Sequence, residues 1–255
     1  MGRMLVHDQG AGGVVCIGQA SHAWVSGQLA RRWGNEAFAA PDPFEEVCLG
    51  AEQHDVGMAE WDLTPDLDRD TGGPLSFMDM PLGLHLRLWS AAPRKVLTQS
   101  PYAALLVSMH GHALYARRDT LEPDAGDSEA VGRFVAEQEA FQRDLLANLG
   151  EDPERARRNQ VLVWALDFLS LAPIMGWVPD TLEAPTRPGQ PHAELRVEAA
   201  ADLRLTVDPW PFDRDELTIR YAGRRLDRPY ETAEEMHAAL AAAPWVAVEA
   251  TWARR

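Results

Sequence analysis

An adjacent histidine and aspartate, His54 and Asp55, stand where a stripe of apolar side chains ends. The stripe belongs to a predicted helix that begins near Pro43, and it consists of Phe44, Val47, Cys48 and Ala51. Burying an ionised side chain without a partner costs several kcal/mol. We therefore expect another group to compensate the charges of this pair.

A second carboxylate raises the same question later in the chain. Asp167 is the only ionisable residue in the otherwise apolar segment 161–171, the second half of a predicted helix that starts at Pro153. A carboxylate rarely occupies such a position unless it is paired or binds a metal ion. We therefore expect Asp167 to share a partner with His54 and Asp55.

Three more histidines fall on the inward faces of predicted helices. His22 lies on a helix from about residue 21 to 33, His85 on a short helix that Pro81 opens, and His110 on a helix that starts at Pro101. One histidine on an apolar face is more often a hydrogen-bonded core residue than a ligand. Several of them together with buried carboxylates suit a borderline divalent cation, and helices can hold such ligands in fixed geometry.

The sequence thus predicts one or two divalent metal ions. A bound cation would keep these side chains deprotonated and remove the cost of burying them. The ligands of the first ion would include His54, Asp55 and Asp167. A second ion would bind His85 and His110. Iron or manganese is favoured, although magnesium, zinc and nickel fit the same ligand types. Residues that could orient the ligands are Gln19, Gln53, Ser108 and Ser170.

The elements that would position these residues are mainly helical. Helices, including two long ones over about 127–149 and 153–171, are expected to form a domain of residues 1–175, in which residues 1–18 are a β-hairpin around the glycine-rich turn 8–12. A proline-rich linker follows Gly176, and alternating apolar residues then predict strands. Residues 176–255 are expected to be a small α+β subdomain, which the hairpin could join.

Composition limits the partners. The formal net charge is -15, from 39 acidic and 24 basic residues, which disfavours binding to nucleic acid or to an anionic membrane. Cys16 and Cys48 lie in apolar runs without CxxC spacing, as expected in a reducing compartment. No leader and no membrane span is recognised, so we expect a cytoplasmic protein that binds a small molecule. Assembly into a homo-oligomer stays open.

The order His22, then His54-Asp55-Val56-Gly57, then Asp167 resembles the HD-domain superfamily of metal-dependent phosphohydrolases over residues 18–171. The resemblance implies a mainly α, HD-domain-like helical bundle. It also implies that His22, His54, Asp55 and Asp167 hold the first metal ion and that Asp55 bridges it to a second. His85 and His110 resemble ligands of the members that bind a second metal, which include phosphodiesterases and di-iron oxygenases. The whole chain, including residues 100–110 and 209–212, also resembles the bacterial protein family DUF3891.

The resemblance implies a metal-dependent hydrolase of the HD type that acts on a small-molecule phosphate ester. The metal would activate a water molecule and polarise a phosphoryl oxygen. Asp55 would take part in catalysis, and Glu52 or His112 could carry protons. Met58 stands where cyclic-dinucleotide phosphodiesterases of the superfamily usually have a lysine, which argues against that substrate. Arginines that could bind phosphate, or lie on solvated helix faces, are Arg87, Arg94, Arg117 and Arg118.

Two other functions stay open. The same six ligands suit a di-iron oxygenase as well as a hydrolase. The protein could also be a non-catalytic, metal-stabilised binding protein that recognises a partner through aromatic residues of its tail, namely Trp210, Phe212, Trp245 and Trp252. For these four, packing against the helical core is the favoured role.

Overall fold

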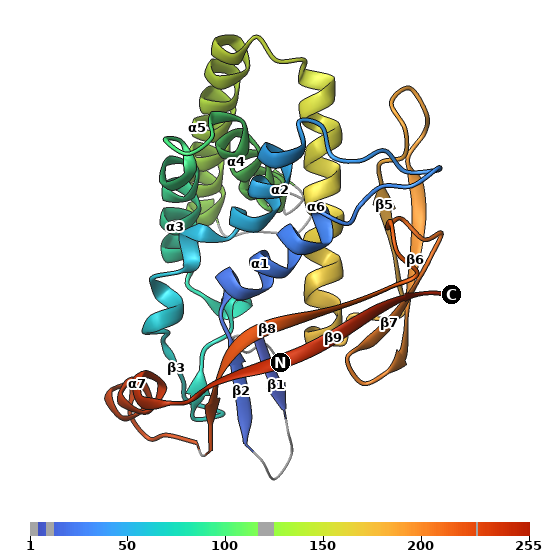
Figure 1. Ribbon diagram of the computed structural model, residues 1–255. Helices are drawn as coiled ribbons and strands as arrows, with labels where there is room; N and C mark the ends of the chain where they lie inside the picture. Colours follow the sequence, from blue (N-terminus) through green and yellow to red (C-terminus); the bar gives the residue numbers. More distant parts are fainter. Residues whose placement is uncertain (1–4, 9–12, 117–124, 228) are drawn as a thin grey trace.

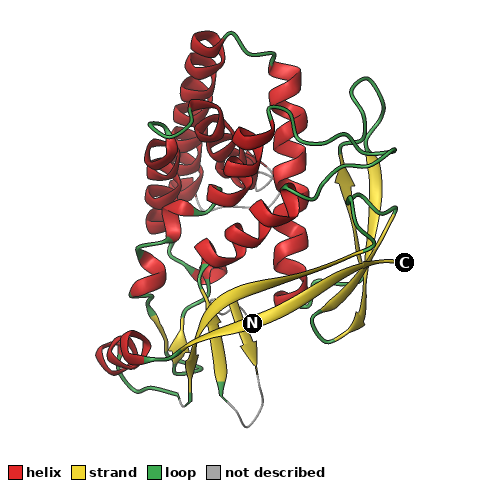
Figure 2. Ribbon diagram, in the orientation of Figure 1, coloured by secondary structure: helices red, strands yellow, loops and turns green. Residues whose placement is uncertain are grey.

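The computed structural model describes residues 5–8, 13–116, 125–227 and 229–255. Its helices lie against a curled sheet (Figure 1, Figure 2). The helices are α1 (Gln19–Ala30), α2 (Phe44–Gln53), α3 (Leu82–Val96), α4 (Pro101–Ala116), α5 (Ala125–Leu149), α6 (Pro153–Met175) and α7 (Ala233–Ala242). No helix in these ranges is long and apolar enough to cross a membrane.

The main sheet has seven strands in the order β1-β2-β8-β9-β7-β6-β5. Their bounds are β1 (Leu5–Asp8), β2 (Val14–Ile17), β5 (Asp180–Ala184), β6 (Ala193–Ala201), β7 (Arg204–Asp208), β8 (Glu216–Leu226) and β9 (Trp245–Arg254). Neighbouring strands are antiparallel, except that β7 and β9 are parallel. A separate pair is formed by β3 (Leu67–Asp68) and β4 (Gly73–Pro74).

The predicted fold class, a mainly α HD-like bundle with a small α+β unit, is wrong. The hairpin of β1 and β2 is part of the main sheet, because Val14 pairs with Leu226 and Ile17 with Gly223 of β8. The strands were each indicated by local alternation, but the pairing joins the two ends of the chain and leaves no periodic signal. Of the predicted hairpin turn, residues 9–12 lie outside the described part of the chain.

The sheet and the helices share one apolar core. Buried residues of α1, α2, α4 and α6 pack with buried residues of both hairpin strands and of β5 to β9. Helix α6 lies beside the sheet, where Tyr221 Oη donates to the carbonyl of Ser170 (2.7 Å) and Trp252 Nε1 donates to that of Leu169 (3.0 Å). The sheet therefore holds the helix that carries Asp167.

Helix α1 begins at Gln19, two residues before the predicted start near residue 21. The hydroxyl of Ser21 accepts the main-chain N–H of Ala222 in β8 (2.9 Å), which ties α1 to the sheet. A residue distant in sequence provides a hydrogen-bond acceptor for the N-terminus of α1: Asp62 Oδ2 accepts the main-chain N–H of Ala20 (3.3 Å). Both contacts fix the position of the turn of α1 that carries His22.

Candidate metal centre

Four elements bring five of the predicted ligands together. Helix α1 supplies His22, the end of α2 supplies His54 and Asp55, and two further helices, α4 and α6, supply the remaining ligands, His110 and Asp167. Two groups of three have ligand atoms within 4.8 Å of one another, namely His22, His54 and Asp55, and His54, His110 and Asp167. All three histidines are at most 1% exposed.

The end of α2 aims His54 and Asp55 in the required direction. His54 is the last residue with helical backbone angles, and Asp55 leaves the helix with φ −102° and ψ 15°. The 3-10 turn Val56–Met58 follows and packs closely on α3, where a Cβ at Gly57 would lie only 2.5 Å from the carbonyl oxygen of Leu88. A glycine is therefore required at position 57 for this close approach.

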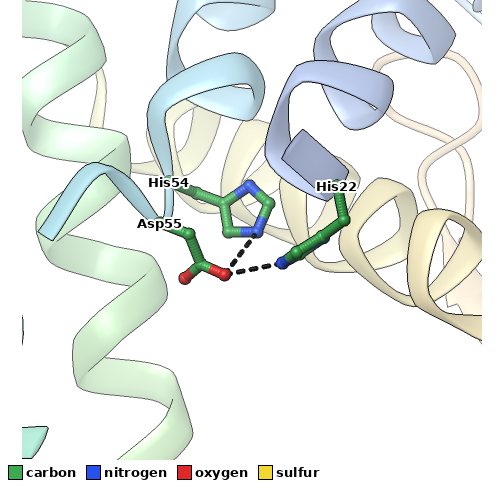
Figure 3. A group of neighbouring side chains, drawn as sticks. All are labelled: His22, His54 and Asp55. Atoms are coloured by element: carbon green, nitrogen blue, oxygen red, sulfur yellow. Dashed lines mark hydrogen bonds and ion pairs between the residues drawn. The ribbon is translucent and has the colours of Figure 1, made fainter. Parts of the chain in front are cut away.

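His22 and Asp55 point toward each other from α1 and the end of α2 (Figure 3). His22 Nε2 lies 2.6 Å from Asp55 Oδ2. The other ring nitrogen, Nδ1, lies 3.0 Å from Ser170 Oγ, which itself donates to the carbonyl of Asp167 and contacts Ser26 Oγ. If Nδ1 carries the proton and donates to Ser170, the lone pair of Nε2 faces a carboxylate oxygen, an arrangement that requires a cation or a proton between them.

His54 has its orientation fixed by the main chain. Its Nδ1 donates to the carbonyl of Ala51 (2.7 Å), so Nε2 is the nitrogen left for the site. Nε2 lies 3.2 Å from Asp167 Oδ1 and 3.7 Å from Asp55 Oδ2 (Figure 3), and it is buried without a hydrogen-bond partner among the described residues. A buried nitrogen that faces two carboxylates without a hydrogen bond is a typical position for a metal ligand.

His110 completes the second group. Its Nε2 lies 3.7 Å from Asp167 Oδ2, and its ring centroid is 4.6 Å from that of His54. The ring lies close to two indoles, with its centroid 5.6 Å from that of Trp89 and 5.5 Å from that of Trp164. These aromatic rings fix the plane of His110 and shield it from water.

The shifted pKa values show that the cluster favours a positive charge beside its two carboxylates. Burial would lower the pKa of His54, but the carboxylates of Asp55 and Asp167 outweigh burial and raise it to about 9. Burial would raise the pKa values of both aspartates, but the neighbouring histidines, His54 above all, lower them. Burial and then the charge of His54 lower the pKa of His110 to about 4. The cluster thus holds two carboxylates that a cation can neutralise.

The donor set fits a divalent ion. Ligand atoms about 2.1 Å from one ion lie no more than about 4.2 Å apart, and the contacts from His54 Nε2 to Asp167 and Asp55 are within that limit. A neutral imidazole nitrogen binds one ion, whereas a carboxylate can bridge two. Because both groups share His54, they describe one metal position with alternative or additional ligands.

His85 lies on the same cavity as the cluster but belongs to neither group. Trp89 Nε1 donates to its Nε2 (3.0 Å), and its Nδ1 contacts Tyr115 Oη. Both ring nitrogens therefore already have protein partners. The predicted second ion, with His85 and His110 as ligands, does not correspond to a cluster among the described residues.

The two predicted proton carriers lie away from the cavity. Glu52 pairs with Arg31 (2.7 Å), and His112 faces Glu139 (3.6 Å); neither is among the residues that line the cavity. Arg87 and Arg94 are exposed on α3, and Arg117 and Arg118 lie outside the described residues. Of the three predicted catalytic residues, Asp55 alone lines the cavity.

Of the predicted orienting residues, Ser170 contacts a ligand, whereas Ser108 donates to Gln138 (2.8 Å). Ser26 was missed, although it lies one helical turn after His22 and donates to the carbonyl of Leu166. Its spacing of four residues from a candidate ligand was the available signal.

A cavity of about 280 Å³ reaches the cluster at Asp55, His110 and Asp167. Most of its wall is apolar or aromatic, and the sequence pattern did not reveal it because the wall combines residues of α1, α3, α4, α6 and the segments between them. The aromatic residues of the wall are Phe77, Trp89, Tyr115, Trp164, Phe168 and Trp177. The candidate metal centre is thus open to a small molecule on one side.

Fold and site together define a protein with a buried His/Asp cluster that could bind a metal ion between helices packed on a mixed sheet. The chain matches the sequence profile of the family described as a protein of unknown function, DUF3891, over residues 4–228, and it belongs to that family. No curated protein and no solved structure matches the chain. The family match confirms the predicted resemblance to DUF3891, while the resemblance to the HD-domain superfamily stays a prediction.

Proposed function

We propose that the protein is a metal-dependent hydrolase that acts on a small-molecule phosphate ester. The observation that carries the proposal is the buried, unpartnered Nε2 of His54, which faces two carboxylates at the end of a ligand-sized cavity. A divalent ion held by His54, Asp55 and Asp167, with His22 and His110 beside them, would lower the pKa of a bound water and polarise a phosphoryl oxygen.

The residues of the chain have separate roles in this proposal. Asp55 lines the cavity and would accept a proton from the attacking water. Water adds to phosphorus, the bond from phosphorus to the ester oxygen breaks, and the alcohol leaves with a proton while phosphate remains. Ser170 and the carbonyl of Ala51 would hold the rings of His22 and His54 in their ligating orientations.

Metal analysis tests the centre. We expect protein purified without added metal to contain close to one equivalent of a divalent transition metal, and Asp167→Asn to bind it at least about a hundredfold more weakly, since loss of a mere orienting partner already costs about 10- to 100-fold. Glu52→Gln is the matched control, because that carboxylate pairs with Arg31 outside the cavity. Full metal content in Asp167→Asn would contradict the assignment.

Hydrolysis is tested with phosphate monoesters and diesters in the presence of Mn²⁺, Mg²⁺ or Fe²⁺. We expect the wild-type protein and Glu52→Gln to release inorganic phosphate from monoesters or the leaving alcohol from diesters, and Asp55→Asn and Asp167→Asn to lose most of this activity. Metal-loaded protein that releases neither product from any ester would overturn the hydrolase proposal and leave the metal assignment intact.

The apolar wall of the cavity favours a second candidate, an iron-dependent oxygenase that acts on an apolar substrate. Oxygenases need an open position at the metal and a dry substrate pocket, and this cavity provides an aromatic surface next to Asp55 and Asp167. Iron in the purified protein and substrate-dependent consumption of oxygen, without phosphate release, would favour this reaction over hydrolysis.

A further inference from the structure

The cavity beside the candidate metal centre has two chemically different parts. One end presents the polar atoms of Asp55, His110 and Asp167, while the rest of the wall is formed largely by aromatic and thioether side chains. The indoles of Trp89 and Trp164 both lie against the ring of His110, so the aromatic surface begins directly at the ligands. A molecule with a polar group at the metal would therefore have its remaining atoms against aromatic rings.

The size of the cavity limits what these rings can hold. An engineered apolar cavity of about 150 Å³ binds benzene, and this cavity measures about 280 Å³. One or two fused rings with a small polar substituent fit that volume. Aromatic walls favour a flat guest, because offset or edge-to-face ring pairs add about 0.5–1.5 kcal/mol to the effect of burial.

The hydrogen-bonding side chains on the cavity wall argue against a polyol as the ligand. Away from the metal ligands, the hydrogen-bonding side chains on the wall are Gln19, His85, Tyr115 and the indoles of Trp89, Trp164 and Trp177. Trp89 donates to His85, His85 contacts Tyr115, and an indole N–H can donate but not accept. A sugar or polyol phosphate would bury several hydroxyl groups here, and each hydroxyl without a partner would cost about 1–3 kcal/mol. An unsubstituted ring carries no such cost.

Gln19 offers one hydrogen-bond donor to a ligand. It begins α1, it is 1% exposed, and its Nε2 is buried without a hydrogen-bond partner among the described residues. Its side chain lines the same cavity as Asp55 and Asp167. A buried amide without a partner is costly to the protein alone, and an oxygen atom of a ligand at the metal would satisfy it.

We propose that this cavity selects substrates with a flat apolar ring, such as aryl phosphate esters, and that the Gln19 amide donates to an oxygen of the group that binds at the metal. Only the choice of a phosphate group rests on the proposed function. The selection for a ring follows from the aromatic wall of the cavity. Gln19 acts as a specificity residue that recognises an oxygen, and Trp164 and Trp177 hold the ring.

Two phosphonates that cannot be hydrolysed test the ring selection. Phenylphosphonate and methylphosphonate are titrated into Mn²⁺-loaded protein by calorimetry, and they carry the same metal-binding group. We expect phenylphosphonate to bind at least about tenfold more tightly, since burial of apolar surface stabilises by about 25 cal/mol per Å². Equal affinities, or no binding of either compound, would overturn the proposal.

Substitutions of the tryptophans that line the cavity test whether its wall causes the preference for a ring. Trp177→Ala, in the segment that follows α6, and Trp164→Leu should each reduce the preference for phenylphosphonate at least about threefold. Trp245→Ala is the matched control, because Trp245 is 68% exposed and does not line this cavity, and it should keep the full preference. A preference that survives both Trp177→Ala and Trp164→Leu would contradict the assignment.

Gln19→Leu keeps the volume of the side chain and removes its amide. We expect this variant to bind both phosphonates about tenfold more weakly and to leave the preference between them unchanged, since the amide contacts an oxygen that both compounds carry. Unchanged affinity for both phosphonates would exclude the role of Gln19.

Two outcomes separate the ring selection from the proposed hydrolysis. A strong preference for phenylphosphonate without turnover of phenyl phosphate would support the ring selection and overturn the hydrolase proposal. Turnover of phenyl phosphate without a preference for phenylphosphonate would support hydrolysis and overturn the ring selection.

Discussion

At the scale of single residues, His54 has the clearest constraint on its chemistry. The carbonyl of Ala51 can only accept a hydrogen bond, so Nδ1 of His54 carries a proton and Nε2 faces Asp55 and Asp167. A proton on Nε2 or a metal ion can neutralise this contact. The two carboxylates favour the protonated ring, which raises the pKa of His54 to about 9 against the effect of burial, and a divalent ion would displace this proton.

His110 and His85 offer a comparison between two histidines on one cavity. We expect His110→Gln to lower the metal affinity about tenfold or more, because its Nε2 faces Asp167. His85→Gln should retain the metal, because both nitrogens of His85 contact Trp89 and Tyr115. Metal content after dialysis against a weak chelator measures the difference. A greater loss in His85→Gln than in His110→Gln would support the two-ion arrangement that the sequence suggested.

At the scale of elements, the contact between the turn Val56–Met58 and α3 controls where Asp55 lies. An added Cβ at Gly57 would meet the carbonyl oxygen of Leu88 at 2.5 Å and Ala92 Cβ at 3.0 Å, so one of the two segments would have to move. Because Asp55 directly precedes this turn, the movement would also disturb the candidate metal centre.

We expect Gly57→Ala to lower the free energy of unfolding by about 1–3 kcal/mol, the usual cost of overpacking. Gly132→Ala is the matched control, because nothing lies within 4 Å of a Cβ at this exposed position of α5. That variant should gain about 0.5–1 kcal/mol from better helix propensity. Urea denaturation monitored by circular dichroism measures both, and a stabilised Gly57→Ala would contradict the close contact.

The burial of Asp62 beside the N-terminus of α1 makes the stability of the protein depend on pH. Burial raises the pKa of Asp62 to about 7, against the opposing effect of the Ala20 N–H. The folded protein therefore retains a proton that the unfolded chain releases above its ordinary pKa of 3.8. This contribution to stability is complete below pH 3.8, and it is lost as pH rises to about 7, by at most about 4 kcal/mol.

Asp62→Asn should remove this dependence, because an amide can accept the N–H of Ala20 without carrying charge. We expect the variant to unfold at a higher temperature than the wild type at pH 8 and at a similar temperature at pH 5. Thermal melts at both pH values provide the measurement, with Asp144→Asn on the exposed face of α5 as the control. A variant that is equally destabilised at both pH values would show that the ionised form is the stabilising one.

At the scale of the whole molecule, strands from both ends of the chain form one sheet that supports the helices. The predicted boundary at residue 175 separates α6 from the strands that accept its apolar face and bond its last turns through Tyr221 and Trp252. The tail aromatics have mixed roles: Trp210, Phe212 and Trp252 are buried, and Trp245 is exposed.

A chain that ends at residue 175 tests the predicted domain division. We expect it to lack a cooperative thermal transition and to bind no metal, because β2 loses its partner β8 and the core of α6 is exposed. Full-length Tyr221→Phe is the control; it loses one hydrogen bond, worth about 1 kcal/mol, and should melt cooperatively. A folded, metal-binding fragment 1–175 would instead establish the helical part as an independent domain.

The sequence by itself predicted five residues that the structure brings into one His/Asp cluster. Buried carboxylates and imidazoles are rare and costly, so His54, Asp55 and Asp167 were conspicuous in apolar helices without any coordinates. Helical periodicity then placed His22 and His110 on inward faces. The same reasoning could not separate His110, which joins the cluster, from His85, which bonds Trp89 and Tyr115, because both satisfy the same pattern.

Only the tertiary structure decided the sheet and the cavity. Pairing of β2 with β8 depends on contacts between distant segments, and local alternation of side chains carries no information about the partner strand. The aromatic wall likewise combines Phe77, Trp89 and Trp177 from separate elements. The sequence predicts that His54 and Asp55 need a compensating charge, because the cost of burying an ionisable group is a property of the single residue. The cavity beside them depends on how several elements pack, so only the tertiary structure shows it.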